Sequence, residues 1–167
     1  MRVIFLDIDG VVNTLILTKE NLPYNGCKKY NDVYCYFADI YDKRVSNEQA
    51  IMWLNIIYQE CKIDGIIITS TWRLLDDENA TLISECLYNT GLNKNIKILG
   101  KTGVDKNRHR GTEIDQYLEE HPEIKEFIII DDDSDMEPFM DRLVQTDIYA
   151  GINARSFQKA KRLFKGV

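Results

Sequence analysis

The chain has 167 residues, 44% of them hydrophobic and 29% charged, which is the composition of one ordinary globular domain and excludes disordered and low-complexity classes. No apolar run is long enough to span a membrane, and the apolar opening, residues 1–6, is too short for a secretory signal, so we expect a cytoplasmic protein with no membrane partner. The formal net charge of −6 opposes non-specific attachment to nucleic acid. The four cysteines lack the paired spacing of a zinc site.

Apolar strands alternate with amphipathic helices along the chain. In order, the pattern predicts a strand over Arg2–Asp7, a helix from Ser46 towards Cys61, a strand over Gly65–Ser70, a helix over about Asp77–Thr90, a strand over Ile96–Leu99, a helix over Thr112–Glu120, a strand over Phe127–Asp131, a weak edge strand over Leu143–Thr146 and a helix over Ala154–Phe164. Gln49 follows Ser46 at the spacing of a capping box, which marks Ser46 as the start of the first helix.

Strands separated by helices imply right-handed crossovers and a parallel sheet that is covered on both faces. The sequence therefore predicts a single three-layer α/β/α domain over residues 1–167. Residues 13–43 are too long for a plain connection and predict an insertion after the first strand. Within it, Asp32–Asp39 alternates aromatic residues, including Tyr34 and Tyr36, and is expected to form a flap strand. Packing onto the core is the more common role for such aromatic side chains, and stacking on nucleobases is the alternative.

Acidic residues follow two of the buried strands. Asp7-Ile8-Asp9-Gly10 follows the first strand, and the cluster Asp131–Asp135 ends the strand that begins at Phe127. Ligands of open α/β sheets bind beyond the carboxyl ends of the strands, where converging carboxylates would repel one another. A divalent cation removes that cost, and hard oxygen ligands suit Mg²⁺. A solvated acidic turn would explain one such cluster, but it explains two clusters less well.

Four motifs resemble those of the haloacid dehalogenase-like (HAD) hydrolase superfamily. Asp7-x-Asp9-Gly10-Val11 after an apolar strand resembles the first motif, and Thr69 at the end of GIIIT resembles the second. Asp131-Asp132 after FIII resembles the fourth motif. Arg110, just before a predicted helix, fits the third motif, where the superfamily more often has lysine. The motifs occur in the superfamily's order, and the resemblance implies a Rossmann-like HAD fold with a small cap or no cap.

The resemblance also implies phosphoryl transfer through an aspartyl-phosphate. Asp7 would be the nucleophile, and Asp9 would protonate the leaving alcohol and later activate water. Thr69 would hold the phosphoryl group. Arg110 would offset negative charge with a forked geometry that lysine lacks, although a nearby basic residue is the alternative for this role. These alternatives are Lys101, Lys106 and Arg108.

The cofactor implied by the resemblance is Mg²⁺. Its expected ligands are Asp7, the backbone carbonyl of Asp9, and Asp131 or Asp132. The choice between Asp131 and Asp132 stays open, and Asp135 has a spacing that the superfamily also uses.

A small insertion leaves the site open to bulky phosphorylated substrates such as nucleic-acid ends. We predict substrate contacts at residues beside the second motif and in the basic stretch 94–110, namely Ser70, Trp72, Arg73 and Lys101. The sequence TSTWR resembles a subset of small HAD domains, some of which are grouped with nucleic-acid repair enzymes.

The leading hypothesis is thus a Mg²⁺-dependent phosphatase that forms its intermediate on Asp7 and acts on a phosphorylated substrate, with nucleic-acid ends or nucleotides as candidates. One alternative is a catalytically weak binding or regulatory protein on a HAD scaffold, against which the intact Asp7 and Asp9 argue. Another is a phospho-accepting receiver, against which the chain order of the motifs argues.

Overall fold

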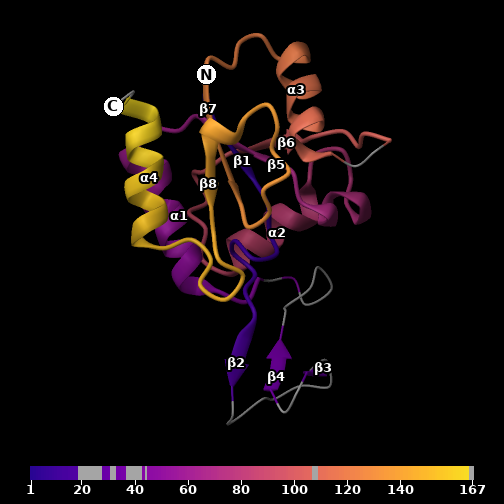
Figure 1. Ribbon diagram of the computed structural model, residues 1–167, viewed down its shortest axis with the longest axis vertical. Helices are drawn as coiled ribbons and strands as arrows, with labels where there is room; N and C mark the ends of the chain where they lie inside the picture. The colour runs from indigo at the N-terminus through magenta and orange to yellow at the C-terminus, as the bar shows by residue number, and fades with distance from the viewer. Residues whose placement is uncertain (19–27, 31–32, 37–42, 44, 107–108, 166–167) are drawn as a thin grey trace.

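Five parallel strands form the central sheet of the computed structural model, which describes residues 1–18, 28–30, 33–36, 43, 45–106 and 109–165 (Figure 1). They are β1 (Arg2–Leu6), β5 (Gly65–Ile68), β6 (Ile98–Lys101), β7 (Glu126–Asp131) and β8 (Leu143–Gln145), in the spatial order β6-β5-β1-β7-β8. Leu6 at the end of β1 pairs with Ile68 on one side and with Ile130 on the other. This register brings the residues that follow β1, β5 and β7 to the same edge of the sheet.

Helices cover both faces of the sheet, which confirms the predicted three-layer, Rossmann-like α/β fold. They are α1 (Glu48–Glu60), α2 (Thr81–Asn89), α3 (Arg110–Glu120) and α4 (Ala154–Lys165). Ile4 and Leu6 of β1 pack in one core cluster with buried residues of α1, α2 and α4. Val3 and Phe5 point to the opposite face and pack with Ile114 of α3. The inner residues of the central strands, such as Val3–Leu6 and Ile128–Ile130, are apolar because both faces of the sheet are buried.

The first helix begins differently from the prediction. Asn47, not Ser46, is the N-cap of α1, and its side-chain oxygen accepts a hydrogen bond from the backbone N–H of Ala50 at 2.9 Å. The Ser46 hydroxyl instead donates to the carbonyl of Thr14 at 2.9 Å. The capping-box prediction for Ser46 was therefore wrong, because the loop after β1 uses that hydroxyl.

The helix predicted from about Asp77 begins only at Thr81. The carboxylate of Asp77 accepts the N–H of Thr81 at 3.0 Å, and that of Asp76 accepts the N–H of Ile83 at 2.8 Å. These side chains satisfy the free donors of the first turn from outside the helix. Ala80, directly before the helix, has a φ of 54° and is not helical in the right-handed sense.

Other boundaries differ from the prediction by one or two residues, and one of these differences matters for the site. β6 lies over Ile98–Lys101 rather than Ile96–Leu99, and α3 begins at Arg110 rather than Thr112. Arg110 is therefore part of the first helical turn. Its backbone is fixed by the helix rather than by a loop.

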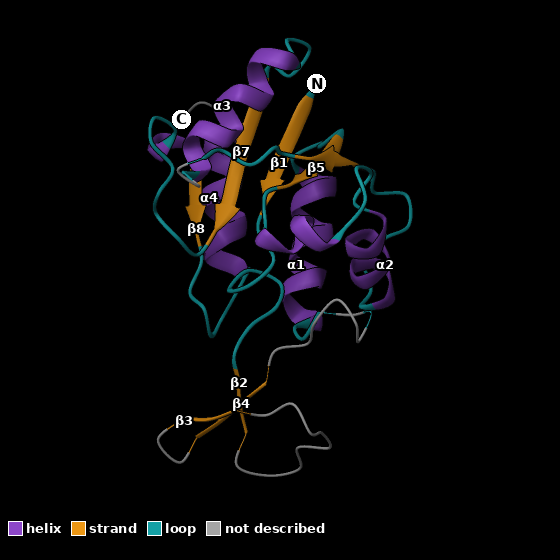
Figure 2. Ribbon diagram, turned by 90° about the vertical axis from the view of Figure 1, so that its right-hand side faces the viewer, coloured by secondary structure: helices purple, strands orange, loops and turns teal. Residues whose placement is uncertain are grey.

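A small antiparallel sheet follows β1, in the order β2 (Ile16–Thr18), β4 (Val33–Tyr36), β3 (Lys28–Tyr30). Figures 1 and 2 place it beyond the carboxyl end of β1, on the side of the sheet where the predicted motifs gather. β4 corresponds to the predicted strand Asp32–Asp39, whereas the pattern does not predict β2 or β3. The aromatic side chains expected in this insertion lie outside what the structure describes.

Within the described ranges, no helix combines the length and the apolar character that a membrane crossing requires.

Candidate active site

The carboxylates that follow β1 and β7 meet at one edge of the sheet. The backbone N–H of Asp7 donates to the carbonyl of Ile130 at 3.0 Å, which keeps the two strand ends together. One carboxylate oxygen from each of Asp7, Asp131 and Asp132 lies within 4.8 Å of the other two. Asp7 and Asp131 are buried, and Asp132 is half-buried. We call Asp7, Asp131 and Asp132 the acidic cluster.

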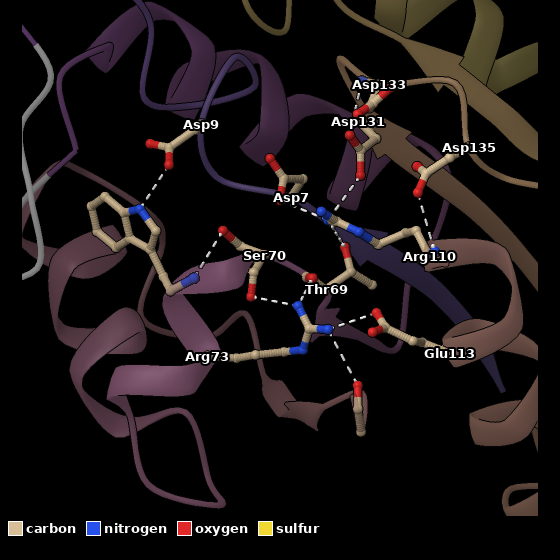
Figure 3. A network of polar contacts seen from close by, with 12 residues as sticks. Asp7, Asp9, Thr69, Ser70, Arg73, Arg110, Glu113, Asp131, Asp133 and Asp135 are labelled. Carbon is tan, nitrogen blue, oxygen red and sulfur yellow. Dashed lines mark hydrogen bonds and ion pairs between the residues drawn. The ribbon is translucent and has the colours of Figure 1, made fainter. Parts of the chain in front are cut away.

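Arg110 reaches the acidic cluster from the first turn of α3 (Figure 3). Its Nη1 donates to Asp7 at 2.8 Å and to Asp131 at 3.0 Å. The same nitrogen donates to the hydroxyl of Thr69 at 3.4 Å. A single nitrogen of Arg110 therefore contacts residues of three different motifs.

The position of Arg110 depends on close packing between α3 and the loop after β7. A Cβ at Gly111 would lie 2.0 Å from the carbonyl oxygen of Glu137, so a residue without a side chain is needed there. The N–H of Gly111 donates to the carbonyl of Asp135 at 3.1 Å, and the N–H of Arg110 donates to the Asp135 carboxylate at 3.3 Å. Asp135 thus holds the start of α3. The other carboxylate oxygen of Asp135 is buried and has no hydrogen-bond partner among the described residues.

Burial dominates the electrostatics of the acidic cluster. It raises the pKa of Asp7 to about 6, although the Arg110 guanidinium opposes this rise. Burial, reinforced by the neighbouring charge of Asp7, raises the pKa of Asp131 to about 8. Burial also raises the pKa of Asp132. One guanidinium does not compensate three converging carboxylates, and this is the condition under which a site favours a divalent cation.

The absence of a side chain at Gly10 leaves the space that the Asp132 carboxylate occupies in the acidic cluster. The φ of Gly10 is 72°, and a Cβ at this position would lie 2.3 Å from the carboxyl carbon of Asp132. The glycine of the first motif is therefore required both for its backbone conformation and for the close approach of Asp132. The loops after β1 and β7 fit together at this contact.

Asp9 lies beside the acidic cluster but not in it. Its Oδ1 accepts a hydrogen bond from the amide nitrogen of Asn13 at 2.6 Å, and its Oδ2 accepts one from the indole Nε1 of Trp72 at 2.9 Å. The residue is half-buried. Sequence reasoning did not identify Asn13, because an asparagine four residues after an aspartate has no specific pattern.

Thr69 and Ser70 follow β5 at the same edge of the sheet. Thr69 is fully buried, and its N–H donates to the carbonyl of Leu6 at 2.9 Å. The Ser70 hydroxyl accepts the N–H of Trp72 at 3.4 Å and begins a 3-10 helix, η2 (Thr71–Leu75). Ser70 therefore shapes the turn that carries Trp72.

Arg73, which we expected to contact substrate, points into the protein. Its Nη2 donates to the carboxylate of Glu113 at 2.6 Å, and this ion pair is almost fully buried, with side-chain exposures of 4% and 2%. Its Nη1 donates to the carbonyls of Thr69 and Ser70. Figure 3 shows this guanidinium between the loop after β5 and α3. Glu113 was not singled out from the sequence, because only the fold brings it to Arg73.

The other basic candidates for the third motif lie elsewhere. The Nζ of Lys101 donates to the carbonyls of Arg73 and Asp76, each at 2.7 Å, so its ammonium group holds η2 in place. Lys106 is exposed, and Arg108 lies outside the described residues. Lys94 and Lys97, two further residues of the basic stretch 94–110, precede β6 and so lie towards the opposite end of this parallel strand.

The acidic residues of the stretch Asp131–Asp135 differ in their surroundings. Asp133 is exposed, and its backbone N–H donates to the Asp131 carboxylate at 3.0 Å. Asp131 and Asp132 are the acids that lie beside Asp7. Asp135 contacts α3 instead.

The sequence matches a family model described as the HAD domain in Swiss Army Knife RNA repair proteins, over residues 3–157. No curated protein and no solved structure gives a significant match.

Proposed function

The chain belongs to the HAD domain family of Swiss Army Knife RNA repair proteins, within the HAD superfamily of hydrolases, and we propose that it is a Mg²⁺-dependent phosphohydrolase with Asp7 as its nucleophile. The observation that carries the proposal is the convergence of Asp7, Asp131 and Asp132, of which Asp7 and Asp131 also contact the guanidinium of Arg110. A carboxylate is a weak nucleophile towards a phosphate dianion unless nearby positive charge offsets the repulsion. Arg110 supplies one such charge, and the acidic cluster offers ligands for a cation that would supply another.

The donor set of the acidic cluster fits Mg²⁺. Its carboxylate oxygens come from three residues, and they are close enough to share one ion. Mg²⁺ prefers hard oxygen ligands and binds through one or two carboxylates, water and substrate phosphate. When bound, the ion would neutralise charge on the phosphoryl oxygens. We propose Asp7, Asp131 and Asp132 as ligands through their side chains, and Asp9 through its backbone carbonyl.

The remaining site residues have separate tasks in this proposal. The carboxylate of Asp7 attacks phosphorus, and the leaving oxygen takes a proton from Asp9. Water then attacks the phosphorus of the intermediate while Asp9 accepts its proton. The bond between phosphorus and the Asp7 oxygen breaks, so inorganic phosphate leaves and the Asp7 carboxylate is regenerated. Thr69 offers a buried hydroxyl beside Asp7 for the phosphoryl group, and Arg110 holds Asp7 in place.

We further propose phosphate monoesters at nucleic-acid ends as the substrate class. The family takes its description from RNA repair proteins, which supports this choice. A small sheet in place of a large cap is consistent with a bulky substrate. Ser70, Arg73 and Lys101 hold η2, and we propose that Trp72 on this helix lies beside the substrate.

The test is phosphate release from 4-nitrophenyl phosphate and from oligonucleotides with a terminal phosphate, compared with phosphopeptides and sugar phosphates. We expect activity that needs Mg²⁺ and prefers oligonucleotide ends. Asp7→Asn should lower kcat by about a thousandfold or more, because it removes the nucleophile. Asp141→Asn is the matched control, since this carboxylate is exposed and lies outside the site.

The absence of phosphate release from every substrate with Mg²⁺ would contradict the proposal and favour a binding or regulatory protein. Activity that survives in Asp7→Asn would exclude Asp7 as the nucleophile. A preference for phosphopeptides or sugar phosphates would leave the reaction intact and overturn the substrate class.

A further inference from the structure

Both carboxylate oxygens of Asp9 are held by N–H donors from different parts of the chain. The donors are the amide of Asn13 at 2.6 Å, in the loop after β1, and the indole of Trp72 at 2.9 Å, in η2 after β5. The dashed line from Asp9 in Figure 3 marks the contact with the indole. A carboxylate bound on both oxygens loses the rotational freedom that an aspartate side chain has in a loop.

The two donors are themselves fixed. Asn13 is fully buried, and its side-chain oxygen accepts the N–H of Ser46 at 3.1 Å, so the amide group has one orientation. Trp72 is half-buried and lies on the short helix η2, which begins after Ser70. The Nζ of Lys101 donates hydrogen bonds to two backbone carbonyls, those of Arg73 and Asp76, and so holds this helix in place. The indole N–H is a donor only, and it cannot exchange its role with the carboxylate.

We propose that Trp72, together with Asn13, is a positioning residue that orients the Asp9 carboxyl group for proton transfer. This inference rests on the proposed function, in which Asp9 gives a proton to the leaving oxygen as the P–O bond breaks and later takes a proton from the attacking water. Such transfers require heavy atoms within about 2.6–3.2 Å, so the rate of proton transfer depends on how the Asp9 carboxyl group is oriented. The sequence led us to expect a substrate contact at Trp72, whereas its polar edge is directed at Asp9.

Leaving groups of different basicity provide the test. The 4-nitrophenolate ion leaves without much help from an acid, whereas the alkoxide of 4-nitrobenzyl phosphate must be protonated, and the two esters present similar rings. Trp72→Phe removes the indole N–H and keeps an aromatic ring. Since acid–base catalysis contributes about 10²–10⁴-fold, we expect kcat/KM to fall about tenfold more for the benzyl ester than for the phenyl ester.

Trp53→Phe is the matched control, because Trp53 lies on α1 and makes no contact with Asp9 among those described. Its ring stacks on that of Phe157, with the two ring centroids 6.0 Å apart. This substitution should change the two esters equally. Asn13→Ala removes the other donor and should reproduce the selective loss; it serves as the second variant if Trp72→Phe does not fold.

Equal losses on both esters in Trp72→Phe, or a rise in KM with kcat retained, would overturn the positioning role, and the latter result would indicate a substrate contact. A wild-type protein that hydrolyses neither ester and releases no phosphate from oligonucleotide ends, phosphopeptides or sugar phosphates would instead contradict the proposed function.

Discussion

Arg110 is the single cation in contact with the acidic cluster among the described residues, and it uses one nitrogen for that contact. Its Nη1 reaches Asp7, Asp131 and Thr69, with distances of 2.8, 3.0 and 3.4 Å. From the sequence we expected a forked contact that lysine cannot make. The observed geometry is one that an ammonium group can reproduce.

We therefore predict that Arg110→Lys keeps activity within about tenfold of the wild type, whereas Arg110→Met loses about a hundredfold or more, because the charge of Asp7 is no longer offset. The measurement is kcat/KM on 4-nitrophenyl phosphate with saturating Mg²⁺. Arg155→Met, at an exposed position on α4, is the matched control. Equal losses in Arg110→Lys and Arg110→Met would show that the guanidinium shape matters, not its charge.

At the scale of elements, two contacts at the first turn of α3, besides its hydrogen bonds to Asp135, connect this helix to neighbouring loops. Gly111 allows the helix to approach the Glu137 carbonyl, and the Glu113 carboxylate forms the buried ion pair with Arg73 of η2. One contact connects α3 to the loop after β7, and the other connects it to the loop after β5. Through them, the helix that carries Arg110 is aligned with both neighbouring strand ends.

Gly111→Ala should therefore impair both stability and activity. The added Cβ would lie 2.0 Å from the Glu137 oxygen, so α3 must move, and we expect a loss of about 1–3 kcal/mol in the free energy of unfolding. Movement of Arg110 should lower kcat/KM as well. Gly103→Ala is the matched control, because its Cβ would meet no atom within 4 Å.

Urea unfolding and phosphatase assays on the two variants check this prediction. Unchanged activity in a folded Gly111→Ala protein would show that the helix start does not set the position of Arg110.

For the whole molecule, the acidic cluster makes stability depend on pH and on metal. The pKa of Asp7 is about 6 and that of Asp131 about 8 in the folded protein, above the values of about 4 expected for unfolded aspartates. Groups with raised folded pKa values favour the folded state at low pH. This contribution declines from about pH 4 and is gone above about pH 6 for Asp7 and above about pH 8 for Asp131. The metal-free protein should thus become less stable over this range.

A divalent cation binds the ionised carboxylates, so it competes with protons. We predict that Mg²⁺ raises the Tm more at pH 8 than at pH 5.5, as measured by thermal unfolding with Mg²⁺ and with a chelator. Asp132→Asn should reduce the Mg²⁺-dependent shift. An equal shift at both pH values would contradict metal binding at the acidic cluster.

The sequence by itself determined the class of fold and the edge of the sheet where the motifs meet. Continuous apolar strands such as Phe127–Asp131 must be buried on both faces, and a parallel sheet places its strand ends together. Periodicity was less reliable at boundaries. The α2 start depends on the carboxylates of Asp76 and Asp77, which act from outside the helix.

Only the tertiary structure decided how the side chains are paired. Asn13 and Trp72 share Asp9, and Glu113 and Arg73 form an ion pair across 40 positions of sequence. The reason is physical: hydrogen bonds and ion pairs have short range and strict direction, and the sequence pattern records burial and period but not orientation. The sequence indicated which residue types gather at the strand ends, and the fold determined which of their atoms meet.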